Sequence, residues 1–218
     1  MNDTLGDRMK RYENVTRNYL PRRTYTIIRL DGSHFHTYTR GLDHPYDQKF
    51  GIAMQLTLQH LFEHIQGSFL GYVQSDEISL VLYDFARLES KPWFGGNIQK
   101  ITSVSAGMAS SYFTHVRTGQ GDTRLAYFDS RVWTIPDPTE VYNYLVWRQK
   151  DARRNSISML AQSKFGPKQL HRASSQEMLS MLEEIGSPWS DQPGHFRLGS
   201  VIHKTSTDAA TMLYTPHV

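Results

Sequence analysis

The sequence predicts an α+β protein with the ferredoxin-like order strand, helix, strand, strand, helix, strand. β-prone runs at residues 24–30, 69–83 and 125–135 predict the strands. Between them, apolar residues recur at helical spacing. Additional C-terminal helices and a short strand are predicted to follow this core.

The composition is that of a globular protein with one catalytic domain and extensions. The chain has 218 residues, of which 39% are hydrophobic and 21% are charged. No apolar run is long enough to span a bilayer, and the polar start lacks the apolar centre of a signal peptide, so a cytoplasmic location is expected. The absence of cysteine excludes disulfides and thiolate metal sites. The net charge of +3 permits an anionic partner.

The first third of the chain predicts two helices and the strand between them. Residues 3–20 predict an exposed helix before the break at Pro21. The strand at 24–30 ends at Gly32. A second helix is predicted to start after Asp47 and to stop at Gly67. The apolar residues of this helix are Phe50, Ala53, Met54, Leu58, Leu61, Phe62 and Ile65.

The middle of the chain predicts a hairpin, a helix and a strand. Residues 69–83 predict a hairpin with Gln74-Ser75-Asp76-Glu77 at its tip. After a loop with Gly95 and Gly96, a helix rich in small residues is expected to run to about Val116. The strand-like run at 125–135 completes the ferredoxin-like order.

Three further elements are predicted in the C-terminal third. Asp137-Pro138-Thr139-Glu140 is typical of a helix start, and that helix is expected to run to about Gln162. A short helix is expected to begin after Ser174 and to end at Gly186. Residues 196–204 predict a strand, followed by a polar tail.

This order of elements is also that of the palm in many polymerases and nucleotide cyclases. We therefore expect a ferredoxin-like polymerase palm in residues 1–136, together with an N-terminal arm. Residues 137–218 are expected to form a helical extension that packs on the palm as one compact unit.

Asp31 and Asp76 are the main candidates for chemistry. Each stands at the end of a β-prone run, where a carboxylate is costly unless something positive binds it. If the two strands are neighbours, both carboxylates and the Gly32 carbonyl suit Mg²⁺. Two such ions favour phosphoryl or nucleotidyl transfer. The alternative is that both acids are ordinary turn residues.

Other candidates are weaker. Phe35 and His36 could stack on a base, although an aromatic residue after a strand is more often part of the core. Lys100 could meet a triphosphate, but such a lysine is usually solvated. A basic stretch could follow a nucleic-acid backbone or could simply be exposed. It comprises Lys150, Arg153, Arg154, Lys164, Lys168 and Arg172.

Four motifs, in order along nearly the whole chain, resemble the tRNA-histidine guanylyltransferase family. They are residues 29–32 with Phe35-His36, residues 74–77, residues 128–132 and residues 144–151. The resemblance implies a palm that extends RNA at its 5′ end, in the 3′-to-5′ direction. Members of this family commonly assemble as tetramers.

By position, the resemblance implies that Asp31, Asp76 and the Gly32 carbonyl bind two Mg²⁺, with Glu77 beside them as a further catalytic carboxylate. Asp47, Ser75 and Lys100 match positions associated with nucleoside triphosphates. Phe35 and His36 match positions near a nucleotide base.

Asp151 and Asn155 match positions implicated in tRNA handling, and with Arg148 they share one face of the predicted helix. We therefore expect RNA contacts along this helix, from Arg148, Asp151, Arg153, Arg154 and Asn155.

Three departures from the family pattern indicate the branch. Residues 153–156 stand where enzymes specific for histidine tRNA have a His-Ile-Asn-Asn run. His44 replaces a family lysine, and Asn97 replaces an arginine that helps to activate the 5′ end. The pattern is similar to the guanylyltransferase-like branch of bacteria and archaea, which repairs 5′-truncated tRNAs.

The predicted function is template-directed 3′-to-5′ addition of nucleotides to the 5′ end of tRNA. It would use ATP or GTP for activation and nucleoside triphosphates as substrates. The alternatives are G addition specific to histidine tRNA, a nucleotide cyclase or other palm nucleotidyltransferase, and an inactive RNA-binding protein.

Overall fold

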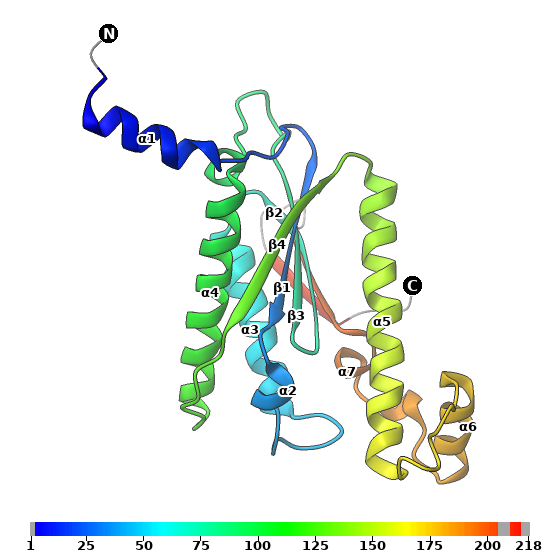
Figure 1. Ribbon diagram of the computed structural model, residues 1–218. Helices are drawn as coiled ribbons and strands as arrows, with labels where there is room; N and C mark the ends of the chain where they lie inside the picture. Colours follow the sequence, from blue (N-terminus) through cyan, green and yellow to red (C-terminus); the bar gives the residue numbers. More distant parts are fainter. Residues whose placement is uncertain (1–2, 205–209, 215–218) are drawn as a thin grey trace.

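The protein is an antiparallel sheet with helices on both faces (Figure 1). The structure, a computed structural model, describes residues 3–204 and 210–214. The strands are β1 (Tyr25–Gly32), β2 (Ser68–Gln74), β3 (Glu77–Tyr83), β4 (Phe128–Ile135), β5 (Ser200–Lys204) and β6 (Ala210–Tyr214). The α-helices are α1 (Leu5–Val15), α2 (Phe35–Tyr38), α3 (Gln48–His64), α4 (Ile98–Gly119), α5 (Pro138–Lys164), α6 (Ser175–Glu184) and α7 (Gly194–Leu198).

The strand order is β4-β1-β3-β2-β5-β6, and every pairing is antiparallel. The first four strands, with α3 and α4, form the predicted ferredoxin-like order, so the fold class is confirmed. Asp31 is opposite Glu77 on one side and Asp129 on the other. The register thus brings acidic residues of three strands to one end of the sheet.

Helices α3 and α4 cover one face of the sheet (Figure 1). Ile28 and Leu30 of β1 point to this face and are fully buried against Leu58 of α3 and Phe113 of α4. Because side chains alternate along a strand, Ile27, Arg29 and Asp31 point to the opposite face. The main core and the acidic residues therefore lie on different sides of the sheet.

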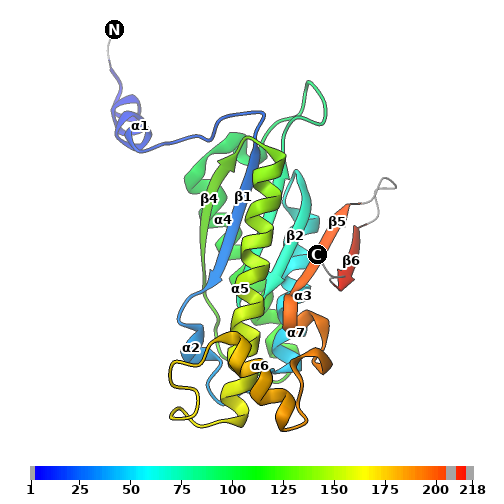
Figure 2. The ribbon, with the colours of Figure 1, turned by 90° about the vertical axis from the view of Figure 1, so that its right-hand side faces the viewer.

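Helix α5 lies on that opposite face (Figure 2). Asp137 caps it by accepting from the Thr139 and Glu140 amides, and Pro138 occupies its first turn, as predicted. Val141 and Tyr144 of α5 pack on Ile27 and Val81. The far end of α5 packs on α6 through a separate apolar cluster, which comprises Leu160, Ala161 and Leu182.

Helix α1 buries none of its residues and projects from the rest of the chain (Figure 1). A capping box between Thr4 and Asp7 starts it. The expected exposed helix is therefore confirmed. None of the helices in the described residues is long and apolar enough to cross a bilayer.

The strand predicted at residues 196–204 is partly wrong, because α7 takes its first part and β5 begins at Ser200. Gly199 separates them with a φ of 82°. A Cβ there would lie 2.5 Å from the Val73 carbonyl oxygen, so only glycine allows this approach. β6 lies where a polar tail was predicted, and residues 205–209 and 215–218 of that tail lie outside the described residues.

Gly71 of β2 tests the packing of α3 on the sheet. A Cβ there would lie 2.7 Å from Leu58 and 2.9 Å from Ile202. We expect Gly71→Ala to lower the free energy of unfolding in urea by about 1–3 kcal/mol, the usual cost of overpacking.

Gly107→Ala is the matched control, because this glycine is exposed on α4 and a Cβ there would meet no atom within 4 Å. It should raise stability by up to about 1 kcal/mol, the difference in helix propensity. Equal stability of the two variants would contradict the close packing of α3 on β2.

Candidate active site

Asp31 and Asp76 meet where β1 ends and the β2–β3 turn begins. The Gly32 amide donates a hydrogen bond to the Asp76 carbonyl oxygen at 3.1 Å, which extends the β1–β3 pairing by one step. Ser75, at the tip, has a φ of 48°, so the turn is tight. The backbone therefore holds Asp31, near the end of β1, beside Asp76 in the β2–β3 turn.

The two carboxylates repel each other. Burial raises the pKa of Asp76, and the negative charge of Asp31 raises it further. Arg131 is a weak partner for Asp31, because its Nη2 lies 3.9 Å from the carboxylate and both side chains are about half exposed. Two adjacent carboxylates with so little positive charge nearby suit a divalent cation.

The donor set at this place is small. No group of three or more His, Cys, Asp or Glu residues with a metal-binding arrangement occurs within residues 3–204 and 210–214. Asp31, Asp76 and the Gly32 carbonyl are the oxygen donors that fit Mg²⁺. Gly32 accepts no larger side chain, because a Cβ would lie 2.3 Å from the Phe35 ring.

Glu77 points to the α5 face and forms a buried ion pair with Arg148. Arg148 Nε donates to Glu77 Oε1 at 2.8 Å, and the side chains of Arg148 and Glu77 are 8% and 10% exposed. Burial raises the pKa of Glu77, and the Arg148 charge opposes this shift. Glu77 is therefore paired with protein, unlike its neighbour Asp76.

The same guanidinium also bonds Asp151, at 2.8 Å. Asp151 in turn accepts hydrogen bonds from Arg154 and Asn155. Arg148 is buried and holds two carboxylates, so the expected RNA contact through its side chain is wrong. Arg153 and Arg154 are exposed, although Arg154 also pairs with Asp151.

A cavity of about 170 Å³ lies next to the hairpin tip. It is lined by Asp47 and Ser75, which the sequence associates with nucleotides, and by Asn155 of α5. His195 and Phe196 of α7 also line it, and neither was among the predicted site residues. The cavity thus joins three predicted site residues that are far apart in the chain.

Aromatic contacts close one side of this cavity. The rings of Tyr46 and Phe196 stack with centroids 4.6 Å apart. Tyr46 Oη donates to the Ser156 carbonyl oxygen at 3.1 Å, and burial raises the pKa of Tyr46 to about 12. Tyr46 is therefore a neutral hydrogen-bond donor that links the α2–α3 loop to α5 at neutral pH.

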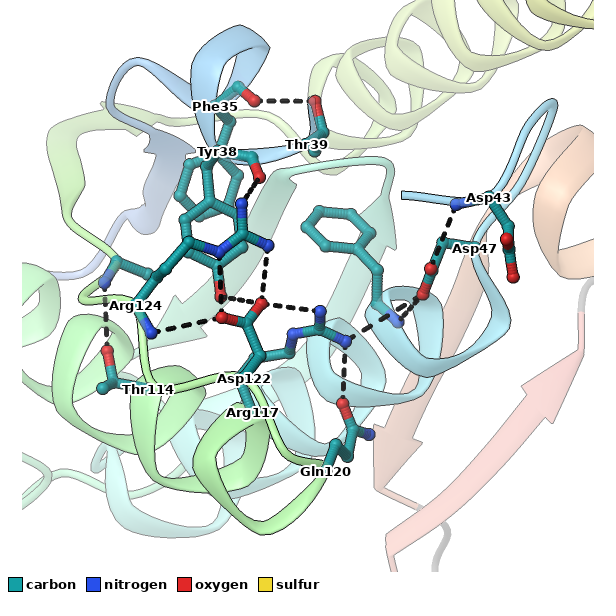
Figure 3. Close-up of polar contacts among 12 residues, drawn as sticks. Phe35, Tyr38, Thr39, Asp43, Asp47, Thr114, Arg117, Gln120, Asp122 and Arg124 are labelled. Carbon is teal, nitrogen blue, oxygen red and sulfur yellow. Dashed lines mark hydrogen bonds and ion pairs between the residues drawn. The ribbon is translucent and has the colours of Figure 1, made fainter. Parts of the chain in front are cut away.

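Asp47 has a structural role as the cap of α3. Its carboxylate accepts from the Phe50 amide at 2.7 Å and from the Asp43 amide at 3.3 Å (Figure 3). Arg117 Nη1 lies 3.9 Å from it. The Asp47 carboxylate thus holds the loop that forms one wall of the cavity.

The neighbouring polar cluster was not predicted from the sequence (Figure 3). Asp122 pairs with Arg117 at 2.8 Å and with Arg124 at 2.7 Å, and accepts from the Tyr38 hydroxyl at 3.2 Å. Hydrogen bonds from Arg124 are the main cause of the strongly lowered pKa of Asp122. This cluster ties the end of α4 to α2 and α3.

The structure does not bring every predicted residue to this place. Phe35 is 3% exposed and packs against Phe50, Phe113 and Phe128, so the expected stacking of its ring on a base is wrong. His36 is exposed on the short helix α2.

Lys100 lies near the start of α4, at the end of the sheet remote from Asp31 (Figure 1). Ser110 of α4 bonds the Phe128 amide, which is level with Gly32, and Lys100 is about 15 Å from Ser110 at the helical rise of about 1.5 Å per residue. Asn97 caps α4 at this remote end, whereas His44 lines the cavity.

Residues 6–136 match the family model of tRNAHis guanylyltransferase (Thg1). A solved bacterial Thg1-like protein in complex with ATP is 44% identical, with a TM-score of 0.92 over 98% of this chain and 93% of that one. Another, in complex with GTP, is 40% identical, with a TM-score of 0.84 over 97% and 90%. The probable tRNA(His) guanylyltransferase of Mus musculus is 28% identical, and the alignment covers 82% of this chain but only 64% of the mouse protein.

The Glu77–Arg148 pair generates a test of stability. We expect Arg148→Met to cost about 3–5 kcal/mol in the free energy of unfolding, because it leaves the Glu77 carboxylate buried and unpaired. Arg154→Met on the same helix should cost less than about 1 kcal/mol, because Arg154 is 67% exposed.

The double variant Glu77→Leu with Arg148→Met serves as the control. It should recover much of the loss, since no unpaired charge remains buried. Urea unfolding measures all three variants, and additive losses in the double variant would show that the two residues are not coupled.

Proposed function

Because the chain belongs to the tRNAHis guanylyltransferase family, we propose that it adds nucleotides to the 5′ end of tRNA in the 3′-to-5′ direction, directed by the opposite strand. The observation that carries this proposal is the meeting of Asp31, near the end of β1, with Asp76 of the β2–β3 turn, next to a cavity lined by Ser75 and Asp47. Members of this family are nucleotidyltransferases, and their Thg1-like structures include complexes with ATP and GTP.

Asp31, Asp76 and the Gly32 carbonyl are the residues that would hold two Mg²⁺. Bound there, the ions supply activation of the attacking oxygen and neutralisation of the leaving phosphate. The mutual repulsion of the two carboxylates supports this assignment, because a divalent cation relieves it.

The cavity beside the hairpin tip is our candidate site for the activating nucleotide. Its walls come from the α2–α3 loop, the hairpin, α5 and α7, and Asn155 of α5 offers an amide to a base. Ser75 lines the cavity and its side chain hydrogen-bonds Asp76, which connects the cavity to the aspartates.

Exposed arginines on α5 support a role in RNA binding. Arg153 and Arg154 lie on the helix that crosses the sheet face bearing Asp31, and both face solvent. Cations in this position pair with phosphates of an RNA backbone. Arg148 plays a different part, because it positions α5 through Glu77.

The proposed reaction has two steps. First, the 5′-phosphate of the RNA attacks the α-phosphate of ATP or GTP, which forms a 5′–5′ pyrophosphate link and releases pyrophosphate. Second, the 3′-hydroxyl of an incoming nucleoside triphosphate attacks the activated 5′-phosphate and loses its proton, which releases AMP or GMP. Asp31 and Asp76 serve both steps.

Replacing Asp31 or Asp76 with Ala should lower nucleotide addition at least about 100-fold, because several kcal/mol of charge stabilisation are lost. The measurement is incorporation of labelled GTP into a tRNA that lacks its first nucleotide, over a range of Mg²⁺ concentrations. Glu184→Gln, an exposed change on α6, is the control and should retain activity. Undiminished addition by both Asp variants would refute the proposed metal site.

A panel of 5′-truncated tRNAs with varied opposing bases tests whether the opposite strand selects the nucleotide that is added. We expect the nucleotide added to be the one that pairs with the opposite base, in several tRNAs. Addition of G alone, confined to histidine tRNA, would instead place the chain with the histidine-specific enzymes. Product formation from triphosphate without any RNA would favour a cyclase.

A further inference from the structure

Trp147 is a large aromatic side chain to which the proposed reaction gives no role. It lies on α5 and is 54% exposed. Its ring contacts two arginines, with Arg148 Cζ 4.3 Å and Arg29 Cζ 5.8 Å from the ring centroid. Tyr144 packs beside it, with centroids 6.0 Å apart. The indole is therefore held in place while more than half of the residue's surface stays in solvent.

Of the two arginines at the indole, Arg148 is paired with Glu77 and Asp151, whereas Arg29 has no such partner among the described residues. Arg29 lies between Trp147 and Trp133, at 5.6 Å from the centroid of the second ring. In the described part of the chain, its guanidinium donates no hydrogen bond and forms no ion pair. Aromatic rings combined with cations of this kind are typical of surfaces that bind single-stranded or frayed nucleic acid.

Two links connect Trp147 to the aspartates. Arg29 is two residues before Asp31 on β1, so both side chains point to the α5 face and lie about 7 Å apart along the strand. Arg148, the neighbour of Trp147 in sequence, pairs with Glu77, which is opposite Asp31. The indole is thus close to the catalytic carboxylates, on the same side of the sheet.

Cations continue from Trp147 along α5, toward the part of the helix that lines the cavity. Lys150 and Arg154 are three and seven residues further on, which places them on the same helix face, and both are exposed. An RNA whose end lies at Trp147 would have its phosphates along this face.

We propose that the Trp147 indole stacks on the 5′-terminal base of the RNA and so places the terminal phosphate at Asp31 and Asp76. This inference rests on the proposed function, because it requires an RNA end at the aspartates. It adds a substrate-positioning residue that reads no sequence, since every base offers a ring face.

The test is a double-mutant cycle between protein and RNA. The protein is wild type or Trp147→Ala, and the RNA is a 5′-monophosphate hairpin whose 5′-terminal nucleotide is either normal or abasic. Fluorescence anisotropy gives the Kd of each pair, without nucleotide present. We expect loss of the terminal base to raise the Kd of the wild-type protein about 5- to 100-fold, the effect of losing one stacked base. The Kd of Trp147→Ala should change little.

Further variants separate ring stacking from simple apolar contact. Trp147→Phe should keep most of the affinity and Trp147→Leu should lose it, because leucine has similar apolar character but no ring. Tyr142→Ala is the matched control, since Tyr142 is an aromatic residue of α5 that is 52% exposed. It should bind both RNAs as wild type does. Circular dichroism and thermal unfolding confirm that each variant folds.

Several outcomes would overturn the inference. Equal sensitivity of wild type and Trp147→Ala to the abasic end excludes stacking on that base. A raised Kd for free ATP or GTP with unchanged RNA affinity assigns the ring to a nucleotide base instead. A molecular mass in solution that differs between Trp147→Ala and wild type assigns the ring to a contact between copies of the chain.

The two proposals fail in different ways. If wild type extends truncated tRNA and yet the cycle shows no coupling, only the stacking inference is lost. If wild type binds no RNA at all, the proposed function is lost and the stacking inference with it.

Discussion

The buried ion pair between Glu77 and Arg148 is the contact on which the arrangement of the site depends. It joins the hairpin of the palm to α5 at the level of Asp31 and Asp76, with both side chains at most 10% exposed. A buried charge that loses its partner is costly, so α5 has little freedom to move away from the sheet at this point. α5 in turn supplies Asn155 and Ser156 to the cavity and holds Trp147 and the exposed arginines. One interaction between distant parts of the chain thus positions the groups assigned to nucleotide and to RNA.

The acidic residues at this end of the sheet differ in how their charges are balanced. Glu77 is paired with Arg148, Asp151 with Arg148 and Arg154, and Asp122 with Arg117 and Arg124. Asp31 and Asp76 are not neutralised in this way, and the charge of Asp31 adds to the raised pKa of Asp76. Negative charge that the protein does not balance itself is available for a cation brought with the substrate. The contrast separates structural carboxylates from the pair that we assign to catalysis.

Much of the fold could be predicted, because its signals are local. Asp137 and Pro138 at a helix start, the capping box at Ser174 and the β-prone runs each depend on residues within a few positions of one another. The boundary near residue 196 was missed, because Gly199 is required by its approach to the Val73 carbonyl, a contact between segments far apart in sequence. Phe35 and Arg148 were given surface roles for a similar reason. Their burial depends on neighbours from other elements, which a single segment of sequence does not show.

The sequence by itself determined the order of the elements, the family motifs and the choice of Asp31 and Asp76, because these follow from local propensity and from residue types at fixed spacing. The tertiary structure alone decided which charged residues are already paired and which remain available. It placed Lys100 at the remote end of α4, moved Arg148 from the surface to the interior, and brought His195 and Phe196 to the cavity. The physical reason is that the pairing of a charge depends on distances of a few ångströms between side chains from different elements, and only the packing of those elements sets these distances.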